Sequence, residues 1–313
     1  MFTATAPGKV ILFGEHAVVY GRPALAAPVV QVRARATVEK TGRPDVTLIA
    51  SDLNRSALLS EVHAHNPLAA VVRVVEQYCN CSLSDGYSLS VTSAIPIASG
   101  LGSGAAISVA VIRALALYMG RGDTISREEV SRLAYEVERL HHGTPSGVDN
   151  TVIAYEQPVY FVRHEPKPLI EPFATARPLR LVIGDTGVRS ATKDVVGDVR
   201  HRWAADPARF EAIFDACGRI AVAGREALAA GDLSAVGVLM NENHEWLVRM
   251  TVSSDALDHL VAVARRAGAL GAKLSGAGRG GNMIALVTPE TEAAVVDQLL
   301  AAGAARVFMS DVG

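Results

Sequence analysis

The stretch PIASGLGSGAA, residues 96–106, governs the interpretation of this sequence. The alternating segment 87–95 that precedes it predicts a strand, and the apolar series that follows it has helical spacing. Gly100, Gly102 and Gly104 therefore lie between a strand and the N-terminus of a helix. Glycine lets successive backbone N–H groups face one anion, and the helix dipole adds partial positive charge there. A di- or triphosphate would fit this geometry.

Two common nucleotide-binding patterns do not describe this run. A Walker A loop needs a lysine directly after its second glycine, and GLGSGAA contains no cation. Gly100, Gly102 and Ala105 satisfy a loose dinucleotide pattern, but the preceding strand is polar-alternating and no clean βαβ unit with an acidic residue follows. Taken alone, the run is equally compatible with a glycine-rich turn that joins a strand to a helix.

Three further runs accompany this one. They are PGKVILFGEHAVVYG at 7–21, HGTPSGVDN at 142–150 and KLSGAGRGGN at 273–282. The last contains four glycines, more than an ordinary hairpin connection needs, which favours a close approach of the backbone to a ligand. Together the four runs indicate phosphate chemistry.

In this order and with these gaps, the four runs resemble the GHMP small-molecule kinases, and GEHAVVYG with HGTPSGVDN is similar to the mevalonate kinases in particular. The resemblance spans residues 7–282. It implies an α+β fold of two domains: an N-terminal mixed α/β domain with the phosphate loop at 1–165, and a C-terminal ferredoxin-like α/β sandwich at 178–313. It implies ATP and Mg²⁺ as cofactors and mevalonate as the acceptor. Only some members form homodimers, so the oligomeric state stays open.

Two residues are the expected catalytic pair. Asp149 follows Pro145 and Gly147 and should lie near a helix start, where a carboxylate is favoured, although a simple capping role fits the same position. The resemblance implies that Asp149 accepts the proton of the substrate hydroxyl. Lys9 precedes the apolar segment VILF and by itself reads as a solvated strand-end charge. The resemblance implies that Lys9 lies beside Asp149 and stabilises the transferred phosphoryl group.

The resemblance also implies the remaining site residues. Nucleotide binding is expected from Pro96, Ser99, Gly100, Leu101, Gly102, Ser103, Gly104, Ala105, Gly276 and Gly278. Metal binding is expected from Ser103 and Glu138, and substrate binding from Glu15, His16, Arg189 and Thr192. By itself Glu138 reads as a surface residue beside Arg139, and His16 as a structural histidine, whereas the resemblance favours the metal role for Glu138. Mevalonate kinases usually read GLGSSAA, so Gly104 replaces a serine here.

The expected reaction is the ATP-dependent phosphorylation of the 5-hydroxyl of (R)-mevalonate. Two alternatives remain at this point. One is a GHMP kinase that acts on homoserine, a sugar or another hydroxyl of mevalonate. The other is a nucleotide-binding protein that has kept the fold and lost catalysis, although a pure binder needs no base such as Asp149.

Composition limits the possible partners. The 313 residues suffice for about two domains, and 30 basic against 32 acidic residues argue against nucleic acid held by bulk charge. No apolar stretch of membrane-spanning length and no leader pattern occur, so we expect a cytoplasmic protein without membrane contact. Cys79, Cys81 and Cys217 are expected to be reduced thiols.

Periodicity also predicts the elements around the motifs. Strands are expected at 10–13, 17–20, 31–39, 179–184, 272–274, 282–287 and 306–309. Helices are expected at 67–78, 105–118, 127–140, 207–230, 233–248 and 254–267, with Ser126 as an N-cap. The proline-rich segment 165–178 is expected to be a linker without regular structure.

Overall fold

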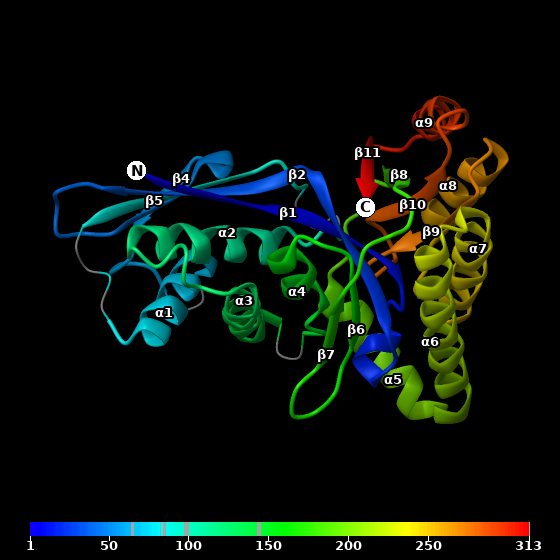
Figure 1. The fold of residues 1–313 in the computed structure, drawn as a ribbon, viewed down its shortest axis with the longest axis horizontal. Coiled ribbons are helices and arrows are strands. Elements are labelled where there is room, and N and C mark those ends of the chain that lie inside the picture. Colours follow the sequence, from blue (N-terminus) through cyan, green and yellow to red (C-terminus); the bar gives the residue numbers. More distant parts are fainter. Residues whose placement is uncertain (64–65, 82, 84–85, 97–99, 143–144, 313) are drawn as a thin grey trace. The chain divides into compact units, whose positions relative to one another are not determined.

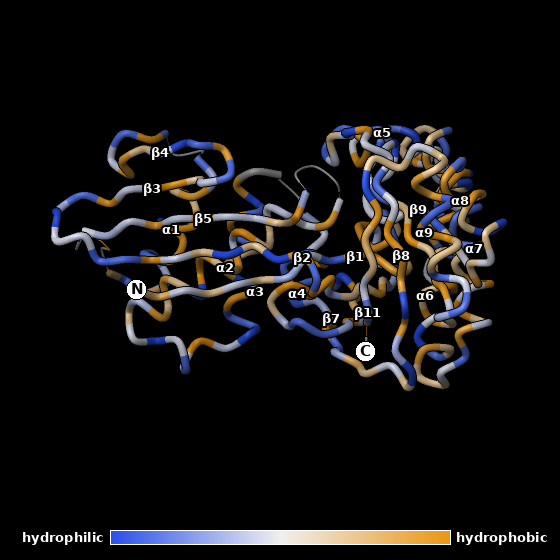
Figure 2. Tube along the Cα trace, turned by 90° about the horizontal axis from the view of Figure 1, so that it is seen from above, coloured by the Kyte–Doolittle hydropathy of each residue, from blue (hydrophilic) through white to orange (hydrophobic). Residues whose placement is uncertain are grey.

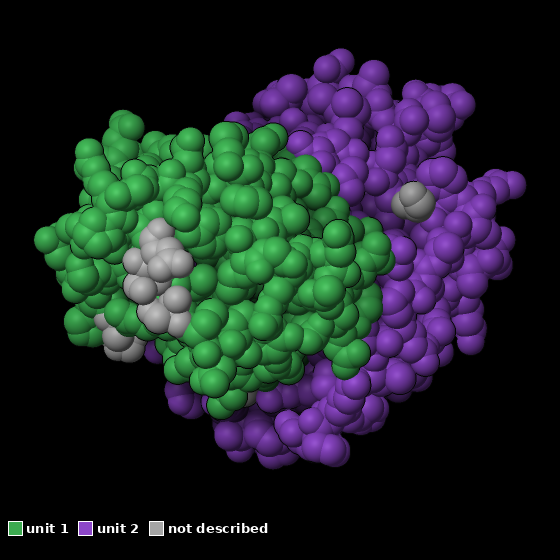
Figure 3. All heavy atoms as spheres, turned by 60° about the vertical axis from the view of Figure 1, so that its left-hand side comes forward, with its two compact units in different colours: residues 1–8, 32–96, 102–156 green, residues 9–31, 97–101, 157–313 purple. Residues whose placement is uncertain are grey.

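The computed structural model describes residues 1–313 except 64–65, 82, 84–85, 97–99, 143–144 and 313. The chain forms two compact units (Figure 3). Unit 1 comprises Met1–Gly8, Val32–Pro96 and Gly102–Glu156, and unit 2 comprises Lys9–Gln31, Ile97–Leu101 and Gln157–Gly313. The expected division into 1–165 and 178–313 follows chain order, whereas the compact units interleave. They interleave because strands β1 (Phe2–Phe13) and β2 (Ala24–Lys40) each contribute residues to both units.

Unit 1 is a sheet covered by helices. The second half of β2 pairs antiparallel with β5 (Tyr87–Ser93), which pairs parallel with β3 (Thr47–Ala50), and β4 (Arg55–Leu58) completes this side of the sheet beyond the 3₁₀ helix η2 (Ser51–Leu53). The helices of unit 1 lie on one face of these strands (Figure 1). They are α1 (Pro67–Cys79), α2 (Ser103–Tyr118), α3 (Arg127–His142) and α4 (Val148–Tyr155). In β2, Ala34 and Ala36 are buried while Arg35 is exposed, as a strand with one covered face requires.

Local sequence fixes where these helices begin. The Asn66 side chain accepts hydrogen bonds from the N–H groups of Leu68 and Ala69 at the start of α1. At α3, Ser126 Oγ accepts from the Glu129 N–H, and Glu129 Oε2 accepts from the Ser126 N–H. This reciprocal capping box confirms the N-cap expected at Ser126.

Unit 2 contains a second sheet. Its four strands are antiparallel in the order β11 (Arg306–Val312), β8 (Leu179–Asp185), β10 (Asn282–Val287), β9 (Gly271–Ser275). Between β8 and β9 come α5 (Thr192–Ala205), α6 (Pro207–Ala230), α7 (Leu233–Arg249) and α8 (Asp255–Arg266), and α9 (Glu292–Ala301) joins β10 to β11. Strand order and connections are those of a ferredoxin-like βαββαβ arrangement, which confirms the expected α/β sandwich.

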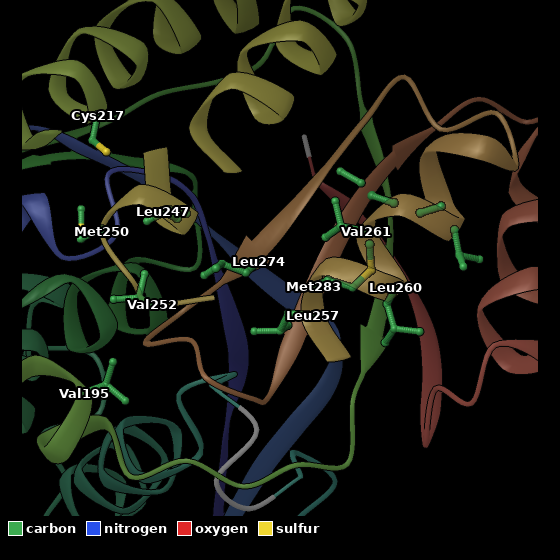
Figure 4. Packing of buried hydrophobic residues seen from close by; sticks show 14 of the residues in the cluster. Val195, Cys217, Leu247, Met250, Val252, Leu257, Leu260, Val261, Leu274 and Met283 are labelled. Carbon is green, nitrogen blue, oxygen red and sulfur yellow. The ribbon is translucent and has the colours of Figure 1, made fainter. Parts of the chain in front are cut away.

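A continuous apolar cluster fills the space between this sheet and its helices. Figure 4 shows Leu274 and Met283, from β9 and β10, near Leu257 and Leu260 of α8. Apolar and polar residues alternate along α6, α7 and α8 (Figure 2), as expected for helices with one buried face. Each described helix is too short or too polar to cross a membrane. The three cysteines are free thiols, as expected.

Three sequence-based element predictions are corrected. Residues Ala17–Tyr20 form the 3₁₀ helix η1 instead of a strand, because Gly14 and His16 both have positive φ and turn the chain. The proline-rich segment contains strand β7 (Leu169–Pro172), which pairs with β6 (Val159–Val162) at an edge, where a proline is tolerated. Helix α5 was not expected, although its buried residues, Val195 and Val199, are four positions apart, which is about one helical turn.

Candidate active site

Three of the glycine-bearing runs meet inside unit 2. The Lys9 N–H donates to the Leu101 carbonyl oxygen at 3.0 Å. Ser275 Oγ accepts from the Ile11 N–H at 3.0 Å and donates to the Ile11 carbonyl at 3.1 Å. A Cβ placed on Gly276 would lie 3.6 Å from the Gly100 Cα. Segments about 90 and 260 residues from Lys9 in sequence therefore pack against the end of β1.

The Gly14–His16 turn is attached to the same place. Glu15 and Lys273 are fully buried and form an ion pair, and Lys273 Nζ also donates to the Leu274 carbonyl at 2.7 Å. Burial raises the pKa of Glu15, and Lys273 opposes this shift. His16 Nε2 lies 2.8 Å from the Ala277 carbonyl, and burial lowers the pKa of His16. The structure thus brings Glu15 and His16 together with the third glycine run.

The third glycine run connects β9 to β10. Gly276 and Gly278 have φ of +97° and +86°. A Cβ on Gly278 would lie 1.9 Å from the Val252 carbonyl oxygen, so the close approach of that backbone accounts for this glycine. The Arg279 guanidinium pairs with Asp198 and donates to the Thr251 carbonyl. These contacts direct Arg279 toward unit 2 itself.

The glycine run 96–106 ends in unit 1 at the start of α2. Gly102 is the N-cap with φ of +73°, and no side chain caps this helix. The Ala106 N–H bonds to the Gly102 carbonyl, so the N–H groups of Ser103, Gly104 and Ala105 precede the first intrahelical bond. Ser103 is half-buried and Gly104 is exposed. This end of α2 offers backbone donors, a hydroxyl and the positive end of a helix dipole.

Asp149 lies in the first turn of α4, next to the N-cap Gly147, whose φ is +87°. The helix start inferred from the sequence is therefore confirmed. Its neighbour Asn150 is buried, and Asn150 Nδ2 donates to the Ser131 carbonyl at 3.0 Å and to Ser131 Oγ at 2.9 Å. Asn150 thus fixes α4 on α3 and leaves Asp149 half-buried at the helix start.

The expected metal ligands belong to the same unit. Glu138 is half-buried on α3, and Ser103 begins α2, which packs against α3. Among the described residues, no group of three or more His, Cys, Asp or Glu side chains could hold a metal ion. One carboxylate and one hydroxyl fit Mg²⁺, which uses few protein ligands together with phosphate oxygens and water.

The other expected site residues have simpler surroundings. Pro96 and Leu101 are buried, and Ser99 lies outside the described residues. Arg189 and Thr192 are exposed, with Thr192 at the start of α5. The segment before them adjoins the third glycine run, because the Gly281 N–H donates to the Val188 carbonyl at 2.8 Å.

Sequence reasoning assigned no role to Lys273, Ser275 or Asn150. Lys273 and Ser275 lie within the run KLSGAGRGGN, at polar positions of strand β9, whose residues are all buried. Polar residues in a buried strand are the signal that could have indicated their roles. Their partners, Glu15 and Ile11, are more than 250 residues away, so no local pattern connects them. Asn150 is adjacent to Asp149, and its type alone does not separate an anchor from a surface residue.

Comparisons with known proteins agree with this arrangement. Residues 66–157 match the GHMP kinases N terminal domain, and residues 225–305 match GHMP kinases C terminal. The mevalonate kinase of Pyrococcus horikoshii is 36% identical over 303 residues, covering 90% of this chain and 88% of the relative. That of Aeropyrum pernix is 38% identical over 291 residues, covering 90% and 87%.

Solved structures show the same relationship. The crystal structure of L. major mevalonate kinase in complex with R-mevalonate has a TM-score of 0.84 and 32% identity, covering 100% of this chain and 96% of that chain. The Methanococcus jannaschii mevalonate kinase has a TM-score of 0.86 and 28% identity, covering 99% and 98%. The chain belongs to the GHMP kinases and, within them, to the mevalonate kinase family.

Proposed function

We propose that this chain transfers the γ-phosphoryl group of ATP to the 5-hydroxyl of (R)-mevalonate, giving ADP and mevalonate 5-phosphate. The observation that carries the proposal is the likeness along the whole chain to a mevalonate kinase crystallised with R-mevalonate. The convergence of the GEHAVVYG turn, Leu101 and the Lys273–Ala277 segment supports it. A cytoplasmic location stays a prediction, and the oligomeric state stays open.

Asp149 is the proposed base. It accepts the proton of the attacking hydroxyl while the oxygen forms its bond to the γ-phosphorus and the bond to ADP breaks. Its place in the first turn of α4 supports this role, because the positive end of the helix dipole favours a carboxylate there. The ammonium group of Lys9, on a buried residue of β1, is the proposed partner that stabilises charge on the transferred group.

The start of α2 is the proposed cradle for the nucleotide phosphates. The N–H groups of Ser103, Gly104 and Ala105 supply donors in this proposal. Gly100, Leu101, Gly102, Gly276 and Gly278 are proposed to contribute to nucleotide binding through the backbone of their glycine segments. Pro96 and Ser99 precede this loop and are proposed to contact the nucleotide as well. A backbone cradle without lysine explains why no Walker A pattern is needed.

Ser103 and Glu138 are the proposed ligands of Mg²⁺ from this chain. When bound, Mg²⁺ neutralises charge on the phosphate oxygens. The Ser103 hydroxyl and the Glu138 carboxylate are hard oxygen donors of the kind that this ion prefers.

His16, Arg189 and Thr192 are the proposed contacts to mevalonate. Glu15, also expected there from the sequence, is fully buried against Lys273 and is proposed below to support the turn instead. Arg189 is exposed and carries the positive charge that a substrate carboxylate requires. His16 is neutral at physiological pH in this site, because burial lowers its pKa, so it acts as a hydrogen-bonding group there.

A coupled assay for ADP tests the proposal directly. The purified protein should turn over (R)-mevalonate with Mg²⁺ and ATP, and homoserine and galactose poorly. Good turnover of homoserine or galactose without mevalonate would refute the acceptor assignment. Nucleotide binding without turnover of any acceptor would refute the kinase assignment.

A further inference from the structure

We propose that the buried Glu15–Lys273 ion pair is a positioning device, which holds the Gly14–His16 turn in register with the Lys273–Ala277 segment. The inference rests on the proposed function, because it says what this register is for. It keeps the acceptor-side group His16 and the nucleotide-side glycine loop in one rigid arrangement. In this role Glu15 holds the turn that carries His16 and does not itself touch the substrate.

The contacts around the Glu15–Lys273 ion pair are the first argument for a positioning role. Lys273 Nζ binds both the Glu15 carboxylate and the Leu274 carbonyl, so its ammonium group joins the turn to the strand that carries the glycine loop. On one side, Ser275 holds Ile11 through two hydrogen bonds. On the other side, His16 bonds to the Ala277 carbonyl. The ion pair therefore lies within a ladder of contacts between two segments that are about 260 residues apart.

The burial of the Glu15 and Lys273 side chains is the second argument for a positioning role. Both side chains have no solvent exposure. Taking two charges out of water is costly, and a well-packed apolar pair at such a position is often as stable or more stable. Within the described part of the chain, no group donates to Glu15 Oε2. Overall stability therefore does not explain the pair, whereas a directional contact that fixes one register does.

The backbone conformation of the Gly14–His16 turn is the third argument for a positioning role. Gly14 and His16 have φ of +91° and +57°, so the turn adopts left-handed conformations at two of three residues. Such conformations persist in a non-glycine residue only when the surroundings hold them. The Glu15 side chain, between these two residues, is anchored to Lys273. Loss of the anchor should let the turn relax and displace His16.

The test compares Glu15→Gln, Lys273→Met and the double variant with wild type. For each protein, kcat and both KM values are measured at a temperature below the unfolding range, and Tm is measured separately by thermal unfolding. We expect kcat/KM for mevalonate to fall by about 10- to 100-fold in each single variant, since small misplacements of a reacting group have effects of this size. The double variant should lose no more than the worse single variant, because the two residues act as one unit.

Leu299→Ala is the matched control. Leu299 is fully buried on α9 in the same unit and lies outside the motif segments. It should lower Tm while leaving kcat and KM of the folded protein unchanged. If the ion-pair variants behave in the same way, with wild-type kinetics and only a lower Tm, the pair is merely structural and the inference is wrong. If Lys273→Met does not fold, Glu15→Gln alone still decides the matter.

A measurement that does not depend on catalysis, the NMR titration of His16, separates this inference from the proposed function. The His16 imidazole is titrated by NMR, with its signal assigned through His16→Gln. Its pKa is held below the ordinary value by burial in the wild type, and Glu15→Gln should move it toward about 6.5, whereas Leu299→Ala should not. An unchanged His16 titration in Glu15→Gln would overturn the positioning role. A wild type inactive on mevalonate, with the expected His16 shift, would overturn only the proposed function.

Discussion

Asp149 is the proposed base, and it also lies in the first turn of α4, where a carboxylate can serve only to stabilise the helix start. We predict that Asp149→Asn lowers kcat by roughly 10²- to 10⁴-fold, the usual effect of removing a positioned proton acceptor, with little change in ATP affinity. Steady-state kinetics and nucleotide titration measure the two quantities. Asp255→Asn is the matched control, because Asp255 also lies in the first turn of a helix, α8, but outside the motif segments. A kcat within threefold of wild type in Asp149→Asn would make Asp149 a cap.

Gly104 is the residue at which this chain departs from the usual GLGSSAA pattern. A Cβ added to Gly104 meets no atom within 4 Å, so Gly104→Ser should be accommodated without strain at the start of α2. If the second serine is normally a metal ligand, water replaces its oxygen here, which Mg²⁺ tolerates. We therefore expect Gly104→Ser to lower the requirement for free Mg²⁺ and to leave kcat largely intact.

A Mg²⁺ titration at fixed ATP for wild type, Gly104→Ser and Ser103→Ala distinguishes the two hydroxyl positions. An unchanged Mg²⁺ requirement in Gly104→Ser, together with a large loss of activity in Ser103→Ala, would show that Ser103 is the sole hydroxyl ligand. In that case the only effect of Gly104→Ser is on the backbone at the helix start, up to about 1 kcal/mol.

At the scale of elements, His244 on α7 connects β9 and α8. Its Nδ1 accepts from the Leu274 N–H at 3.3 Å, and its Nε2 lies 3.1 Å from Asp258 Oδ1. Burial lowers the pKa of His244 to about 4. Between about pH 4 and the ordinary value near 6.5, the unfolded chain binds a proton that the folded chain does not. The contribution of His244 to stability is therefore complete above about pH 6.5 and is lost as the pH falls toward 4.

We predict that the free energy of unfolding falls with decreasing pH in this window by up to about 1.4 kcal/mol per pH unit from His244. Urea unfolding at several pH values measures this slope. In His244→Gln the slope should flatten, because the amide can accept from Leu274 but does not titrate. His259→Gln, on an exposed residue of the neighbouring helix, should keep the wild-type slope. Equal slopes in wild type and His244→Gln would contradict the assignment.

Long helices with a regular apolar pattern could be predicted from the sequence, whereas short elements could not. Helix α6 was predicted with its observed ends because Pro207 begins it and Gly231 ends it. Four apolar residues, Ala17–Tyr20, do not separate a strand from a 3₁₀ helix, and the positive φ of His16 has no signal in the sequence. Strand β7 was missed because proline density marks loops and sheet edges alike.

At the scale of the whole chain, the glycine runs indicated the chemistry but not how the compact units are composed. The pair Glu15–Lys273 and the contact of Ser275 with Ile11 join the beginning of the chain to its last third. Such pairs are set by topology, so composition and periodicity do not reveal them. Segment Lys9–Gln31 consequently belongs to unit 2, although it lies at the other end of the sequence.

This composition of unit 2 predicts that residues 157–313 do not fold alone. The Phe13 ring, fully buried, fills the space beside Gly224 of α6, where an added Cβ would lie 2.6 Å from the ring. Tyr20 stacks on Phe214 of the same helix with ring centroids 4.1 Å apart. Without residues 9–31, α6 would expose this surface, and the burial of a large aromatic side chain is worth about 1.5–3 kcal/mol, a large fraction of a typical net stability.

Thermal unfolding of the fragment 157–313, followed by circular dichroism, tests this prediction. We expect a broad, weakly cooperative transition, where the whole chain gives a sharp one, since a unit that lacks part of its core loses specific packing before it loses helices. Adding the separate fragment 1–156, which carries Phe13 and Tyr20, should restore a sharp transition. A fragment 157–313 that unfolds cooperatively near the Tm of the whole chain would show that chain order, with its boundary near 165–178, describes the folding units better than their contacts do.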